Sequence, residues 1–220
     1  MLDRLPPEVG MPIALMNAQA FAETGLTQYN KLADHYRESR DSGQAFDYFM
    51  AMRTATPAIV NLAFACELLI KLIVWQRTGS YPKGARAHSL VDLANLIPED
   101  ARGRLRAHFD SELQSHKSAG KESPLTIVDF RCSFTADNGS SNGPVETFDD
   151  AVASVDKAFV IWRYVFELKE GTPIRSIDMR ALVLLPVVLE KEVGTYHLGK
   201  QTITLGSVSL TFDAAQTESA

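Results

Sequence analysis

The chain contains few residues of the kinds that form cross-links or bind metal ions. Its 220 residues include two cysteines, Cys66 and Cys132, and five histidines. This pattern offers neither a disulfide framework nor a four-ligand zinc site. Cys66 also lies inside a strongly apolar segment. We therefore expect no structural disulfide and no metal site, and the sequence indicates no cofactor.

The chain also lacks an excess of positive charge. It has 22 Lys plus Arg against 27 Asp plus Glu, which gives a net charge of −5. Non-specific binding to nucleic acid relies on a basic surface that displaces counterions, so this composition argues against it, although a local basic site is still open. The first residues lack the basic and then apolar order of a signal peptide, and we expect a cytoplasmic protein.

The composition is that of a folded domain. Apolar residues make up 45% of the chain, which is enough for a substantial core, and the 22% of charged residues argue against global disorder. The length predicts one large domain or one domain with an appendage.

The most apolar segment begins near Thr56 and ends at Gly79. Thr56 can cap a helix with its hydroxyl group, Pro57 suits the first helical position, and Gly79 can adopt the left-handed conformation that ends a helix. Apolar residues between these positions surround the helix almost completely. The pattern therefore predicts a helix that is buried on most sides.

This segment is long enough to cross a membrane, which takes roughly 20 apolar residues. Glu67 and Lys71 lie in its middle, however, and Asn61 also interrupts it. Charges at that depth in a bilayer are costly. We therefore expect a core helix and no membrane association. The spacing of Glu67 and Lys71 predicts an ion pair on one helical face.

Several other segments have helical periodicity. The first is expected to begin at Pro12 and to reach about Arg37, after an irregular lead-in over residues 1–11. The spacing of Ser89 and Asp92 predicts a capping box at a helix start, and Pro98-Glu99-Asp100 indicates another helix start. A regular four-and-three spacing predicts one helix through Phe148, Val152, Val155, Phe159, Trp162 and Phe166. Pro186 should kink or divide a later helix.

Two segments have a different character. Residues 120–146 lack helical periodicity and form a loop insertion, in which Leu125 to Phe134 could be extended. Residues 196–212 alternate and turn like a β-hairpin or meander. The sequence therefore predicts a helical bundle over residues 12–172, a C-terminal helix with a β-hairpin over 173–213, and a tail over 214–220.

Three stretches resemble the HEPN superfamily of helical-bundle proteins. They are Asn61–Lys71, then His88-Ser89-Leu90 with Leu93 after it, and finally Ala158–Glu167. The resemblance covers about residues 14–170. It implies an up-and-down bundle of four or five core helices that is frequently dimeric. HEPN proteins are associated with RNA cleavage, nucleotide binding, toxin–antitoxin pairs and antiphage defence.

Active HEPN members act as metal-independent ribonucleases, through an Arg followed four to six residues later by a His near the start of the last core helix. Arg163 lies in the corresponding helix of this chain, but no His follows it within that interval. Arg102 and His108 have a suitable spacing on an earlier helix. We treat this pair as a weak catalytic candidate, because such spacings arise by chance and a solvated basic helix face explains it as well.

Two further groups of residues are candidates for a site. Lys83, Arg86 and His88 could receive a phosphate, although His88 could instead brace the loop before the next helix. The second group is a structural polar network, in which Arg163 and Tyr164 would join the predicted ion pair of Glu67 and Lys71.

Three functional hypotheses follow. The leading one is a non-catalytic HEPN-like module that binds RNA, a nucleotide or a protein partner in a bacterial defence or stress system. The second is a metal-independent endoribonuclease toxin that uses Arg102 with His108, or a pocket around Arg86 and His88. The third is a structural dimerisation scaffold, in which the terminal strands pair between two copies of the chain.

Overall fold

The computed structural model describes residues 6–45, 47–83, 88–119, 131–132, 145–156, 158, 177–194, 199–205 and 208–214. This part of the chain is mainly α-helical, as predicted. Its helices are α1 (Pro7–Ser42), α2 (Tyr48–Thr78), α3 (Leu90–Ala94), α4 (Glu99–Ala119), α5 (Phe148–Ser154) and α7 (Met179–Gly194).

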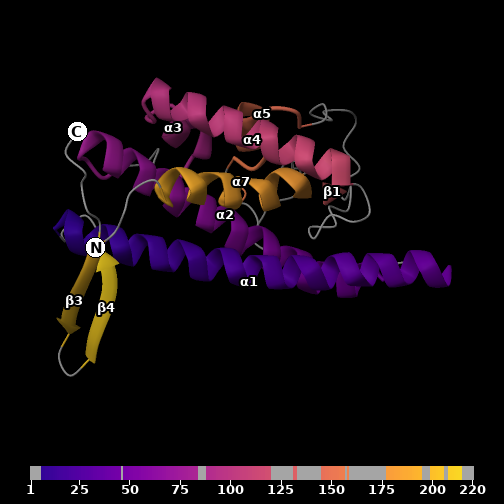
Figure 1. Ribbon diagram of the computed structural model, residues 1–220. Coiled ribbons are helices and arrows are strands. Elements are labelled where there is room, and N and C mark those ends of the chain that lie inside the picture. The colour runs from indigo at the N-terminus through magenta and orange to yellow at the C-terminus, as the bar shows by residue number, and fades with distance from the viewer. Residues whose placement is uncertain are drawn as a thin grey trace.

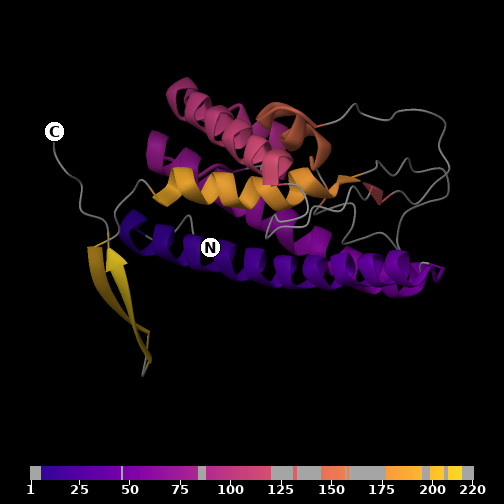
Figure 2. The ribbon, with the colours of Figure 1, turned by 45° about the vertical axis from the view of Figure 1, so that its right-hand side comes forward.

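The helices pack as a bundle around α2 (Figure 1). α2 returns along α1, and both of these long helices extend beyond the rest of the bundle (Figure 2). α2 also contacts α3 and α7, while α4 and α5 pack against each other and against α7. The apolar middle of α2 is therefore covered by several neighbours, as its sequence predicts.

α1 begins at Pro7, so the expectation of an irregular lead-in as far as Met11 and a helix start at Pro12 is wrong. Pro7 occupies the first turn, where its missing N–H group has no helical partner in any case. Pro12 is buried inside the helix and removes one backbone hydrogen bond near the helix start. The helix continues to Ser42 and ends at Gly43, whose φ of 67° is left-handed.

α2 also begins earlier than predicted. Pro57 lies inside the helix, so Thr56 is not its N-cap. Proline removes a single backbone bond there, and buried alanines on either side, Ala55 and Ala58, keep the adjacent turns packed in the core. The predicted end is confirmed: Gly79 has a φ of 71°, and its N–H donates to the carbonyl of Trp75 at 2.9 Å.

The starts of α3 and α4 agree with the sequence prediction, whereas α5 is shorter than predicted. The Ser89 hydroxyl accepts a hydrogen bond from the N–H of Asp92 at 3.1 Å and caps α3, and α4 begins at Glu99 as predicted. α5 ends at Ser154, with Val155 as its C-cap. The single helix expected from Phe148 to Phe166 is therefore wrong at this point, because Val155 departs from helical φ and ψ angles. Residues 159–176 lie outside the described residues.

Proline does not divide α7. This helix continues through the buried Pro186 to Gly194, with buried aliphatic residues before and after the proline. Asp178 lies just before the helix, and its carboxylate accepts a hydrogen bond from the N–H of Arg180 at 2.9 Å. This contact satisfies one of the free backbone donors at the start of α7.

Two short antiparallel strand pairs accompany the helices. β1 (Arg131–Cys132), within the segment expected to be extended, pairs with β2 (Ile177–Asp178). β3 (Gly199–Leu205) pairs with β4 (Val208–Ala214) beside the N-terminal end of α1 (Figure 1). The helical body is thus confirmed, while a stable C-terminal hairpin stays a prediction, because two strands alone are marginal in water.

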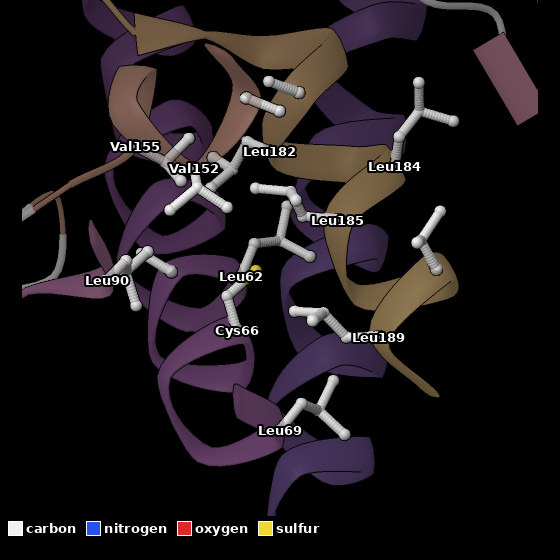
Figure 3. Close-up of a cluster of buried hydrophobic side chains, with 14 of the residues drawn as sticks. Leu62, Cys66, Leu69, Leu90, Val152, Val155, Leu182, Leu184, Leu185 and Leu189 are labelled. Carbon is white, nitrogen blue, oxygen red and sulfur yellow. The ribbon is translucent and has the colours of Figure 1, made fainter. Parts of the chain in front are cut away.

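The core joins residues far apart in the sequence. Figure 3 shows Leu62, Cys66 and Leu69 of α2 facing side chains of α7 such as Leu185 and Leu189. Leu90 of α3 belongs to the same cluster, as do Val152 of α5 and Val155 at the end of that helix. Burial raises the pKa of the Cys66 thiol, so this cysteine packs as a small apolar residue and is not a reactive thiolate.

Residues 51–78 in α2 are long and apolar enough to cross a membrane, but 83% of the most apolar window is buried inside the molecule. The core helix of a soluble protein meets the same criterion, so this property is weak evidence. The expectation of no membrane association stays a prediction.

α1 approaches α2 closely along a row of small residues. Ala14, Ala18, Ala22 and Gly25 are all buried and recur on one face of α1. A Cβ atom added at Gly25 would lie 2.6 Å from Cγ of Leu62 and 3.1 Å from its backbone nitrogen. Leu62 is itself fully buried in the core.

We predict that Gly25→Ala destabilises the protein by about 1–3 kcal/mol, because overpacking at the contact with Leu62 outweighs the gain in helix propensity. Gly103→Ala is the matched control, since no heavy atom lies within 4 Å of its added Cβ. That variant should be more stable by roughly 0.5–1 kcal/mol. Urea unfolding measures both changes, and an equal gain in the two variants would contradict the close approach.

Candidate functional site

A buried carboxylate on α2 joins two of the groups of residues singled out in the sequence. Oε1 of Glu67 accepts a hydrogen bond from Nζ of Lys71 at 2.6 Å. The same oxygen lies 3.0 Å from Nδ1 of His88. The predicted ion pair is therefore present, and it extends to a histidine outside the helix. We call these three residues the Glu67 cluster.

The Glu67 cluster spans the boundary between core and solvent. Glu67 and Lys71 are 1% and 6% exposed, whereas 57% of the His88 side chain is exposed. Oε2 of Glu67 is buried and has no hydrogen-bond partner among the described residues. A buried charge is tolerated when it is paired, and Lys71 supplies that pairing from one helical turn away.

His88 is held between two structural elements. It directly precedes Ser89, the N-cap of α3, and its ring contacts α2. This contact ties His88 to α2, while bracing of the loop by the imidazole stays a prediction because residues 84–87 lie outside the described residues. Lys83 lies in the loop after α2 and is exposed, and Arg86 lies outside the described residues. The structure thus brings His88 to the Glu67 cluster and leaves the three-residue phosphate site of Lys83, Arg86 and His88 untested.

The structure does not bring Arg102 and His108 together. The Arg102 guanidinium donates to Oδ1 of Asp149 at 2.6 Å and to Oδ1 of Asn95 at 3.0 Å. In an α-helix, residues six positions apart lie about 120° apart around the axis and ~9 Å apart along it. Arg102 therefore ties α4 to α5, and no described contact links it to His108.

Asp149 is the centre of this surface network. Arg106 also donates to its carboxylate, from Nε to Oδ2 at 2.8 Å. Partial burial opposes ionisation of Asp149, but the hydrogen bonds from Arg102 and Arg106 outweigh it and lower the pKa below the ordinary value. The network fixes the start of α5 on α4, which is a structural role.

The sequence analysis did not predict a second buried carboxylate, that of Glu192. Oε1 of Glu192, near the end of α7, accepts from Arg77 of α2 at 2.6 Å and from Arg104 of α4 at 2.7 Å. Nε of Arg104 also donates to Oε2 of Glu192 at 3.1 Å. These residues, which we call the Glu192 cluster, join three helices. No local spacing connects them, so the sequence carries no signal for the cluster.

The remaining network residues of the sequence prediction, Arg163 and Tyr164, lie outside the described residues. Within the described part of the chain, no group of three or more His, Cys, Asp or Glu side chains could hold a metal ion. Comparisons with known proteins add no relative, because no family model, no curated protein and no solved structure matches the chain. The HEPN resemblance therefore stays a prediction.

We predict that Glu192→Gln destabilises the protein by about 2–3 kcal/mol. The change removes the buried negative charge that Arg77 and Arg104 share and leaves Arg104 with only its exposed partner Asp100. The effect is smaller than for a fully buried pair because both arginine side chains reach solvent. Glu112→Gln removes a half-buried partner of the exposed Lys191 and should cost less than about 1 kcal/mol. Equal losses in urea unfolding would contradict a special role of Glu192.

A pH dependence follows from Asp149. Its pKa is lower in the folded chain than in the unfolded chain, so its ionised form stabilises the fold above the unfolded value of about 3.9. This contribution is lost as the pH falls through the lowered pKa. We predict that Asp149→Asn destabilises the protein at pH 7 and that the difference from the wild type shrinks as the pH falls through the lowered pKa of Asp149. Asp110→Asn controls for loss of an exposed charge. A difference independent of pH would contradict the prediction.

Proposed function

We propose that the protein is a HEPN-like helical module that binds a nucleotide at His88 and does not cleave RNA. The observation that carries this proposal is an exposed imidazole held by a buried ion pair. Most surface side chains can turn freely, but Nδ1 of His88 lies 3.0 Å from a carboxylate that is itself fixed by Lys71. A fixed imidazole loses less rotational freedom when it binds a ligand.

A phosphate-bearing ligand suits the charges of this region. Lys71 balances the charge of Glu67, so a protonated His88 would give the cluster a net positive charge. The neighbouring loop adds Lys83, and Arg86 follows it in the sequence. Histidine in its cationic form donates hydrogen bonds to phosphate oxygens at close range.

The overall charge favours a small ligand over a long RNA. A net charge of −5 gives the chain no general attraction for a phosphate backbone, whose binding relies on several Lys and Arg contacts. A nucleotide requires only one local site. The contacts of Arg102 with Asp149 and Asn95 also weigh against the ribonuclease hypothesis, because this guanidinium is already engaged.

The place of this module in a bacterial defence or stress system rests on the HEPN resemblance alone. The same holds for the homodimer and for the partner protein that the resemblance implies. The dimerisation scaffold that would pair the terminal strands of two copies remains an alternative, and β3 and β4 provide the backbone edges it would need.

We predict that ADP binds the wild-type chain and that His88→Ala weakens this binding at least tenfold, or about 1.4 kcal/mol, because the fixed donor is lost. His108→Ala is the matched control and should leave the affinity unchanged. Isothermal titration calorimetry measures both variants. Equal affinities for wild type and His88→Ala would place the site elsewhere, and no binding of ADP or ATP would remove the proposal.

The same two variants test the enzyme hypothesis. Incubation of total RNA with the wild type, without added metal, should leave the RNA intact. Cleavage that disappears in His108→Ala but persists in His88→Ala would contradict our proposal and support the pair of Arg102 and His108.

A further inference from the structure

The contact between Glu67 and His88 determines which nitrogen of the ring carries a proton. A carboxylate only accepts hydrogen bonds, so the 3.0 Å contact with Oε1 is a hydrogen bond when Nδ1 of His88 is protonated. In a neutral imidazole the other nitrogen, Nε2, then has a lone pair and accepts. Glu67 can therefore fix both the orientation and the tautomer of the ring, as carboxylates do for metal-bound histidines.

This tautomer is unsuited to a phosphate until the ring takes up a second proton. Phosphate oxygens accept hydrogen bonds, and the lone pair of a neutral Nε2 would repel them. Protonation at Nε2 turns that nitrogen into a donor and gives the ring a positive charge. Because Lys71 already balances Glu67, this proton changes the formal charge of the cluster from zero to +1.

We propose that Glu67 is a positioning residue that holds His88 in the Nδ1–H form, so that nucleotide binding at Nε2 is coupled to the uptake of one proton. The inference rests on the proposed function for its ligand, but the tautomer is a property of the free protein. Lys71 acts through Glu67, because its hydrogen bond to Oε1 holds this carboxylate in place within the core.

Several ionisable groups belong to the elements that adjoin His88 in the described part of the chain. Glu67 and Lys71 belong to α2, Lys83 to the loop after it and Asp92 to α3. Asp156 follows α5, and its carboxylate accepts from the N–H of Val91 at 3.4 Å. Glu67 contacts the His88 ring directly, with Oε1 at 3.0 Å from Nδ1. The proton uptake is therefore assigned to His88.

The first test needs no ligand. Nitrogen-15 NMR of the wild-type chain at pH 8.5 to 9 distinguishes a protonated ring nitrogen from one with a lone pair, and His88→Ala assigns the signals. We expect the Nδ1–H form for His88. The double variant Glu67→Met with Lys71→Met removes both buried charges at similar volume and should lose this preference. An Nε2–H form in the wild type would overturn the positioning role, and this result does not depend on the stability of the variant.

The second test separates the coupling from the proposed function. Calorimetric titration with ADP between pH 7.5 and 9, in buffers with different ionisation enthalpies, measures proton uptake where the terminal phosphate, whose own pKa is about 6, is already ionised. We expect proton uptake on binding and an affinity that falls as the pH rises.

The outcomes of the two tests are distinguishable. His88→Ala, if it retains weak binding, should show no proton uptake. Binding without uptake in the wild type would overturn the coupling and leave the proposed nucleotide function intact. An absence of ADP binding, together with the Nδ1–H form in the free protein, would overturn the proposed function and the coupling but support the positioning of His88 by Glu67.

Discussion

Burial of charge inside an apolar core is the constraint on which this structure depends. α2 is apolar around most of its surface and is covered by α1, α3 and α7, yet it carries Glu67 and Lys71 in its buried half. Neither charge is tolerable there alone. Glu192 is likewise a buried charge on α7, and it is paired with Arg77 of α2 and Arg104 of α4. Each buried carboxylate thereby fixes how neighbouring elements meet.

The sequence predicted those parts of the fold that depend on local chemistry. The left-handed end of α2 at Gly79, the cap at Ser89 and the burial of α2 all follow from residues within one or two helical turns. The helix starts predicted at Pro12 and Pro57 were wrong, whereas the start predicted after Pro98 was right. Proline is favourable in the first turn but is also tolerated inside a helix whose neighbouring turns pack well, as Pro57 and Pro186 demonstrate.

The candidate site could be predicted only in part, for the same reason. The spacing of Glu67 and Lys71 is local and indicated their ion pair, whereas His88 and Glu67 are 21 positions apart in the sequence and no local pattern connects them. The Glu192 cluster joins three helices and has no sequence signal. The exposed ring of His88 is therefore oriented by a carboxylate in the core. The proposed function depends on this fixed orientation.

The measurement that tests this account most directly is a double-mutant cycle between Glu67→Gln and His88→Ala, read as the free energy of unfolding. The loss of pairing with Lys71 is common to both variants that carry Glu67→Gln, so it cancels in the coupling energy. We predict a coupling of about 1 kcal/mol between the two residues. Additive effects, within about 0.3–0.5 kcal/mol, would show that the buried carboxylate does not hold the surface histidine.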